Sequence, residues 1–187
     1  MPKIVDHDQR RTEIVHALWE VISERGIEGV TFQAVARSAG FSVGRVQHYF
    51  ASKDALVRAG CRELIDASAA VHAERTSRSQ SPWEALAQLL MQPIPRSEEL
   101  RLGAAVWYAY MARGVVDPAI GEIAREATHR GLEEASALLR RAGADESAAP
   151  RLMGLSAGLA QQVLLRAVQA EEALGLVREE IAALREG

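Results

Sequence analysis

The chain has 187 residues, of which 48% are hydrophobic and 25% are charged, and its net charge is −3. A chain of this length buries roughly two thirds of its unfolded surface, so it needs neither a disulfide nor a structural metal to fold. The single cysteine, Cys61, excludes a disulfide framework and a cysteine-based metal site. The longest apolar stretch is too short to span a membrane, and the amino-terminal residues lack the pattern of a secretion signal, so we expect a soluble, cytoplasmic protein.

Helix-forming residues dominate the composition. Alanine and leucine are abundant, whereas aromatic residues, which strands favour, make up only 5% of the chain. The composition therefore predicts an all-α protein.

The first predicted element is an amphipathic helix over 8–25. Its apolar residues recur at intervals of three and four, which places them on one face of a helix. They are Ile14, Val15, Leu18, Val21 and Ile22. Gly26 follows the helix at the position where a left-handed C-terminal cap is expected.

Two short helices and a long one follow. Thr31 is the expected N-cap of a helix over 33–39, and Ser42 is the expected N-cap of a helix over 43–49. The long helix is predicted from 53 to about 75.

Prolines, glycines and capping residues divide the rest of the chain into five further helices. Pro82 suits a first helical turn, and Asp117 and Gly143 mark the start and the end of the longest of the five. The predicted ranges are 82–91, 97–113, 118–141, 148–169 and from 171 toward the end of the chain.

The two short helices form a predicted helix-turn-helix. Gly40 lies in the turn, where a residue that tolerates positive φ is needed. We expect the first short helix to pack inward through Val35 and Ala36, and the second through Val46 and Phe50. An α-helix fits the major groove of DNA, where its leading residues reach the base edges, so the outward face of the second helix is the predicted reading surface.

Local charge supports DNA binding. The segment 31–62 carries five cations and a single anion, although the whole chain is acidic. Such cations neutralise phosphates, and the N–H groups at helix starts offer further phosphate contacts. The residues that we expect to contact DNA are Thr31, Arg37, Ser42, Val43, Gly44, Arg45, Gln47, His48, Tyr49 and Lys53.

The segment 29–56 resembles the DNA-binding domain of the TetR family of transcriptional regulators. The positions that match the usual pattern of that family are Thr31, Val35, Ala36, Ala39, Gly40, Ser42, Gly44, Phe50, Lys53 and Leu56. The sequence departs from the pattern where the family's tyrosine falls at Gln47 and its histidine at Tyr49. The tyrosine's role in contacting DNA then passes to Tyr49 and His48, and the Gln47 amide is placed to read adenine.

The resemblance implies a helix-turn-helix domain over 1–50 and a helical ligand-binding and dimerisation domain over 51–187. It implies a homodimer that binds a near-palindromic operator, with two recognition helices about one DNA turn apart. A small effector in the second domain would release the DNA, and repression is the expected sign of control.

Large apolar side chains in the second domain are candidate effector contacts, because ligand pockets are lined mainly by such groups. They are Trp83, Met91, Trp107, Tyr108, Tyr110, Met111 and Met153. The same helical spacing also fits plain core packing. Few charges accompany the Trp107 segment, so we expect a mostly apolar or aromatic effector.

The predicted helices over 118–141 and 148–169 are candidates for the dimer interface, as the penultimate long helices are in the TetR family. The candidate contact residues lie on the helix over 148–169. One stripe of this helix carries Leu152, Leu155, Leu159, Val163 and Arg166. Packing within one chain is the alternative use of this stripe.

Two other classes of function remain open at this point. One is a helical small-molecule-binding protein or enzyme with a non-functional helix-turn-helix, and the other is a DNA binder without a ligand or sequence preference. The histidines are scattered, and no nucleophile elbow, phosphate loop or dinucleotide motif is present. We therefore expect no enzymatic activity, no cofactor and no metal.

Overall fold

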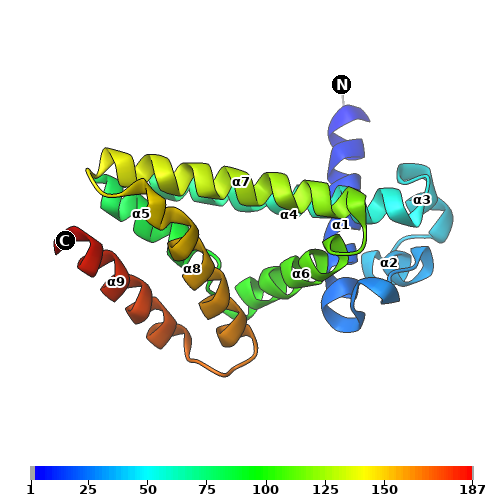
Figure 1. Ribbon diagram of the computed structural model, residues 1–187. Helices are drawn as coiled ribbons and strands as arrows, with labels where there is room; N and C mark the ends of the chain where they lie inside the picture. The colour runs from blue at the N-terminus through cyan, green and yellow to red at the C-terminus, as the bar shows by residue number, and fades with distance from the viewer. Residues whose placement is uncertain (1–2, 187) are drawn as a thin grey trace. The chain divides into compact units, whose positions relative to one another are not determined.

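The computed structural model describes residues 3–186, with side chains from residue 7 onward. Residues 1, 2 and 187, at the outer limits of the expected domains, lie outside the described part. Within residues 3–186 every regular element is a helix, which confirms the all-α fold (Figure 1). The amino-terminal elements are α1 (Lys3–Arg25), the 3-10 helix η1 (Ile27–Gly29), α2 (Phe32–Ala39), α3 (Val43–Tyr49) and α4 (Lys53–Thr76). The later elements are α5 (Pro82–Met91), α6 (Glu98–Gly114), α7 (Pro118–Arg141), the 3-10 helix η2 (Glu146–Ala148), α8 (Ala149–Leu164) and α9 (Ala170–Glu186).

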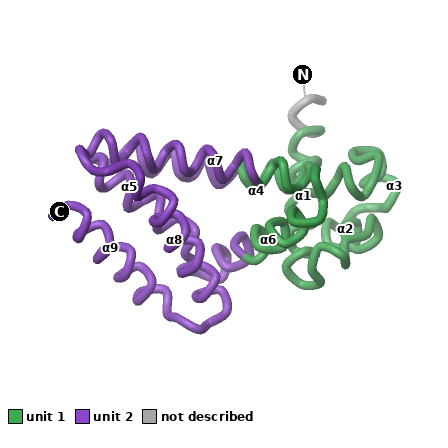
Figure 2. The backbone as a smooth tube through the Cα atoms, viewed as in Figure 1, with its two compact units in different colours: residues 1–66, 105–124 green, residues 67–104, 125–187 purple. Residues whose placement is uncertain are grey.

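The chain forms two compact units, and neither is a continuous stretch of sequence (Figure 2). Unit 1 contains the described residues up to 66 together with 105–124. Unit 2 contains 67–104 together with the described residues from 125 onward. The helices α4, α6 and α7 therefore each contribute residues to both units. In the described part of the chain, no helix is both long enough and apolar enough to cross a bilayer.

Unit 1 is built on the buried face of α1. The five apolar residues that predicted this helix are each at most 3% exposed, which confirms their place in the core. Gly60 of α4 lies in close contact with Leu18 of α1 and Tyr110 of α6, because a Cβ at Gly60 would stand only 2.7 Å from the Tyr110 hydroxyl oxygen. The Trp19 indole N–H donates to the Gly60 carbonyl oxygen at 3.1 Å. Close backbone approach at Gly60 thus joins α4 to α1 and α6.

Unit 2 has an apolar core in which α5, α8 and α9 pack on one another. The buried Ser156 hydroxyl of α8 donates to the Leu90 carbonyl of α5 at 2.6 Å. The Arg101 guanidinium donates to the carbonyl oxygens of Val163 and Leu164, at 3.0 and 2.6 Å. These carbonyls lie in the last turn of α8, beyond the last i to i+4 hydrogen bonds of the helix, so Arg101 adds a side-chain cap to them.

The end of α8 differs from the sequence expectation. The helix ends at Leu164 rather than continuing to 169, and Arg166 adopts a left-handed conformation with φ of 61°. The Arg166 N–H donates to the Val163 carbonyl at 3.0 Å, and the Ala167 N–H donates to the Gln162 carbonyl at 2.9 Å. This pair of bonds is a Schellman closure, which satisfies carbonyls at the helix end. The prediction that Arg166 continues the leucine stripe of the helix is therefore wrong.

Candidate nucleic-acid interface

The turn between α2 and α3 depends on Gly40. This residue has φ of 67° and ψ of 28°, a left-handed conformation that side chains with a Cβ disfavour. Its N–H donates to the Arg37 carbonyl at 3.3 Å, and the Phe41 N–H donates to the Ala36 carbonyl at 2.9 Å. The turn that the sequence predicted is thus closed by hydrogen bonds, and it fixes the direction in which α3 leaves α2.

A hydroxyl side chain caps the start of each of the helices α2, α3 and α4. In each case the oxygen accepts a hydrogen bond from the N–H three residues later, which stabilises a helix by about 1 kcal/mol. The pairs are Thr31 with Ala34 at 3.0 Å, Ser42 with Arg45 at 3.2 Å, and Ser52 with Ala55 at 3.1 Å. The capping role predicted for Thr31 and Ser42 is therefore confirmed, and the starts of the short helices are well defined.

The helix α3 has one buried face and one open face. Val46 is fully buried, and Phe50, which follows the helix, is 4% exposed. Val35 of α2 is also fully buried, so the two short helices pack inward as predicted. Seven residues from 42 to 49 were predicted to form the DNA-reading surface, and of these five are exposed and two are half-buried. The exposed ones are Ser42, Gly44, Arg45, Gln47 and His48, and the half-buried ones are Val43 and Tyr49.

The cations around α3 are largely free of carboxylates. The Arg45 guanidinium lies 5.1 Å from the centre of the Phe41 ring, which stacks it against the turn. The Lys53 ammonium donates to the Glu28 carbonyl at 3.4 Å. Within the described residues, neither Arg37 nor Arg45 forms an ion pair. Their charges therefore remain available to an anionic partner.

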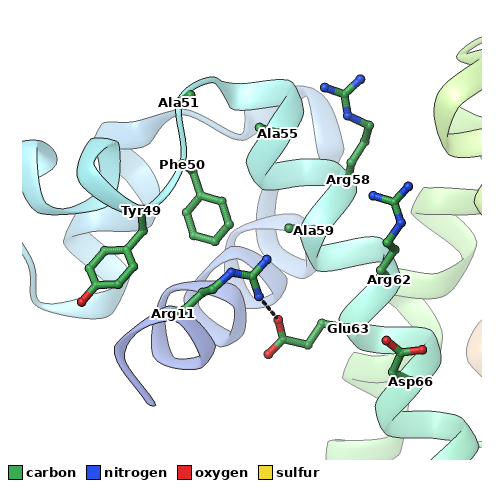
Figure 3. A pocket seen from close by; sticks show the side chains of 10 residues that line it. All are labelled: Arg11, Tyr49, Phe50, Ala51, Ala55, Arg58, Ala59, Arg62, Glu63 and Asp66. Atoms are coloured by element: carbon green, nitrogen blue, oxygen red, sulfur yellow. Dashed lines mark hydrogen bonds and ion pairs between the residues drawn. The ribbon is translucent and has the colours of Figure 1, made fainter. Parts of the chain in front are cut away.

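Aromatic rings gather at the end of α3. The Tyr49 ring lies 4.6 Å from the His7 ring and 5.5 Å from the His48 ring, measured between ring centres. Tyr49 also lines a pocket of about 620 Å³ that is shown in Figure 3.

This pocket lies in unit 1, between α1, the turn after α3 and the first half of α4 (Figure 3). Arg11 crosses it, with its guanidinium 5.2 Å from the Phe50 ring and 3.1 Å from a Glu63 carboxylate oxygen. Arg58 and Arg62 lie one helical turn apart on α4 and extend to the same side (Figure 3). Within the described part of the chain neither of these two arginines forms an ion pair. They add positive charge beside the recognition helix.

The residues predicted to line an effector pocket fall into both units. Trp107, Tyr108, Tyr110 and Met111 belong to unit 1, whereas Trp83, Met91 and Met153 belong to unit 2. The three residues of unit 2 are partly buried and pack against its apolar core. In unit 1, Tyr110 is fully buried, Trp107 and Tyr108 are half-buried, and Met111 is 36% exposed.

Burial changes the titration of two neighbouring groups in unit 1. The Tyr110 hydroxyl has no hydrogen-bond partner, and burial raises its pKa far above the usual range, with a further contribution from Cys61. Burial also raises the pKa of the Cys61 thiol to about 11, although the nearby Arg62 charge opposes this shift. Both groups are neutral near pH 7, so they behave as core side chains.

The predicted dimer residues lie mainly inside unit 2. Leu152, Leu159 and Val163 are each at most 5% exposed within a single chain, and Leu155 packs against the same core while half-buried. Arg166 is exposed and follows the helix. The leucine stripe therefore packs within the chain, which was the alternative use of this helix.

Arg11, Arg58 and Arg62 were not among the residues predicted to surround the recognition helix. Arg58 and Arg62 were counted in the local charge of the segment 31–62, but that count does not show which face of α4 they occupy. Arg11 comes from another helix, and only the fold brings it to Phe50.

A capped, glycine-linked pair of short helices with an open, cation-flanked second helix defines a helix-turn-helix DNA-binding protein. Residues 14–59 match the family of bacterial regulatory proteins of the tetR type, and residues 82–186 match the C-terminal domain of BetI-type transcriptional repressors. The chain belongs to the TetR family and is a transcriptional regulator.

Individual relatives agree with this assignment. The HTH-type transcriptional regulator PksA of Bacillus subtilis (strain 168) is 30% identical over 175 residues, which cover 90% of this chain and 85% of PksA. A transcriptional regulator from Rhodococcus sp. Rha1 has a crystal structure with a TM-score of 0.85 and 28% identity, over 95% of this chain and 96% of that one. A regulator from Saccharomonospora viridis, crystallised in complex with choline, has a TM-score of 0.81 at 21% identity and covers 96% of both chains. This last likeness shows the fold alone.

Proposed function

We propose that this regulator is a repressor that binds a near-palindromic operator as a homodimer and is released by a small, mostly apolar effector. The open face of α3 carries the proposal, since a helix that buries only Val46 and exposes its other side is shaped for a major groove. The match of residues 82–186 to a repressor domain supports the sign of control.

In this proposal the interface residues have two kinds of role. Gln47, His48 and the Arg45 guanidinium face the base edges. Thr31 and Lys53 contact phosphates, because both lie at helix starts whose N–H groups favour anions. Arg37, Ser42, Val43, Gly44 and Tyr49 complete the proposed contact surface.

The regulatory part of the proposal assigns DNA binding to residues 1–50 and effector binding and dimerisation to 51–187. The choline complex of the Saccharomonospora regulator supports it, since it shows a protein of this fold with a small organic molecule. The candidate effector contacts are those on α6 in unit 1 and those of unit 2, and the few charges around Trp107 favour an apolar molecule. Substitution of the contacts on α6 and, separately, of those in unit 2 tests which of the two sets binds the effector.

We place the proposed dimer interface on α8. Because Leu152, Leu159 and Val163 fill the core of unit 2, the exposed side of the helix must supply most of the contact. This side carries Gly154, which is exposed and where an added Cβ would meet no atom within 4 Å. A Gly154→Arg variant should dissociate the dimer, which sedimentation of the purified protein measures. A dimeric mass together with unchanged helical content would move the interface elsewhere.

The most informative test is selection of bound duplexes from a random pool at physiological salt. We expect the selected sequences to contain two related half-sites in inverted orientation, about one helical turn apart. Enrichment of a single unpaired half-site would contradict the two-fold arrangement. Retention of all sequences alike would contradict operator recognition, and a complete absence of binding would contradict the DNA-binding role.

A further inference from the structure

A polar pocket of about 480 Å³ lies in unit 2, where α4 ends and α5 begins. Its lining comes from the end of α4, the loop before α5, α5 itself, the segment before α6 and the first turn of α6. None of the residues predicted to bind an apolar effector lines this pocket. It is therefore separate from the proposed apolar contacts.

The charged side chains that line the pocket are mainly cationic. Arg75, Arg78 and Arg96 line it, and Glu84 is its single acidic lining residue, so these side chains give it a net charge of +2. One carboxylate oxygen of Glu84 accepts the Gln80 N–H at 2.7 Å, which holds that group against the loop. The positive charges outnumber the negative ones in a protein whose total charge is −3.

Two of the three guanidinium groups have no carboxylate partner. Within the described residues, Arg75 and Arg96 form no ion pair, whereas Arg78 pairs with Glu74 at 2.7 Å on the surface. Arg75 is half-buried, so part of its hydration is already lost. Guanidinium groups without a carboxylate partner are suited to bidentate recognition of phosphate or carboxylate oxygens.

A second, independent feature points to the same pocket. The Ser79 hydroxyl is buried and has no hydrogen-bond partner, although Ser79 lines the pocket. The Ser79 N–H donates to the Thr76 carbonyl at 3.0 Å, so the loop holds this residue in place. Buried hydroxyls are nearly always satisfied in native proteins, and a rotation of the Ser79 side chain toward the pocket would let an oxyanion accept the missing hydrogen bond. The Gln88 side chain, also in the lining, supplies a further amide.

We propose that this pocket binds a small organic oxyanion, a metabolite that carries phosphate or carboxylate groups, and that its binding changes the affinity for the operator. The binding part stands on the pocket itself, whereas the regulatory part rests on the proposed function. Arg75 lies on the same continuous helix, α4, that begins at Lys53, the proposed phosphate contact. One unbroken helix therefore links the proposed anion pocket to the proposed operator-binding end.

Binding is tested by calorimetric titration of the purified full chain, without DNA, with inorganic phosphate and separately with citrate. We expect one anion per chain, and the stronger of the two probes identifies the kind of oxyanion. An Arg75→Gln/Arg96→Gln variant should bind at least about tenfold more weakly, since charge-assisted bonds contribute most of the affinity. An Arg130→Gln/Arg141→Gln variant loses the same charge from exposed positions of α7 and should bind like the wild type.

A Ser79→Ala variant separates the hydroxyl from the charges. It should weaken binding of the anion without reducing the thermal stability of the free protein, because the hydroxyl has no hydrogen-bond partner in the free protein. Equal affinity in the wild type and in the Arg75/Arg96 variant would overturn the site. So would the absence of binding of both anions at millimolar concentration, in which case the arginines are solvated surface charges.

The regulatory part has its own readout. Operator affinity is measured with and without the bound anion, with chloride adjusted to keep the ionic strength constant. We expect a change in the wild type that the Arg75/Arg96 variant lacks. An anion that binds without altering operator affinity would overturn the regulatory part. Failure to select any operator would refute the proposed function instead, and the titration would still decide the site.

Discussion

Replacement of Gly44 by alanine tests the open face of α3 in two ways at once. Gly44 is the second residue of this helix, in its first turn, and a Cβ at that position would meet no atom within 4 Å. Alanine is favoured over glycine in a helix interior by about 0.8–1 kcal/mol. The free energy of unfolding, measured by urea titration with circular dichroism, should therefore rise by roughly 0.5–1 kcal/mol.

The same methyl group should weaken the operator complex. It projects from the exposed side of the recognition helix, where the proposed complex places DNA, so it must displace either the helix or the bases. We expect a loss of affinity of about tenfold, equivalent to roughly 1.4 kcal/mol. Fluorescence anisotropy with a labelled duplex from the selection measures this loss. The prediction is thus a more stable protein that binds DNA less well.

Gly40→Ala is the matched control for the backbone. A Cβ at Gly40 also meets no atom within 4 Å, but φ of 67° is left-handed. Alanine in this conformation costs about 1–2 kcal/mol, so this variant should be less stable, in contrast to Gly44→Ala. If Gly44→Ala gains stability and keeps full operator affinity, the open face of α3 does not lie against DNA at this position, and the proposed contact is refuted.

Two further substitutions and one labelling reaction test other parts of the structure. Lys53→Ala should weaken all duplexes alike and reduce the slope of log affinity against log salt by about one unit; an unchanged slope would contradict a phosphate contact. Gly60→Ala should destabilise the protein by about 1–3 kcal/mol, because its Cβ would overlap Leu18 and stand 2.7 Å from the Tyr110 oxygen; a wild-type urea midpoint would show that the contact relaxes. The native Cys61 thiol, with a pKa of about 11, should react with iodoacetamide at pH 8 at least about a hundredfold more slowly than the thiol of the protein unfolded in urea. Because folding raises this pKa, the neutral thiol stabilises the fold below pH 9, and this stabilisation is lost as the pH rises through 11. Rapid labelling of the folded protein would show that the thiol is accessible.

Most of the helices could be predicted from the sequence because their boundaries are set by local chemistry. The ranges 43–49, 82–91 and 118–141 coincide with α3, α5 and α7. Ser42 and Gly40 mark a start and an end through their own side chain and backbone, without help from distant residues. The open and buried faces of the helix-turn-helix follow from the same local pattern.

Features that depend on distant contacts could not be predicted. Arg166 ends α8 in a conformation that normally selects glycine, and Arg101, far away in sequence, binds the last carbonyls of that helix. Similarly, Arg75 and Arg96 share a pocket only because the intervening segment folds back. Apolar periodicity places Trp107 and Trp83 on helices, but it does not show that they belong to different compact units.

The discontinuity of unit 1 limits how this regulator can be rebuilt. A hybrid regulator joins the DNA-binding domain of one protein to the ligand-binding domain of another, and the sequence suggests a junction near residue 50. A cut at this junction removes Val106, Tyr110 and Ile120, which are at most 1% exposed and belong to the same unit as the helix-turn-helix. A hybrid that keeps the native core of unit 1 must include 105–124 as well as the amino-terminal helices, so two separate segments of the sequence have to be transferred together.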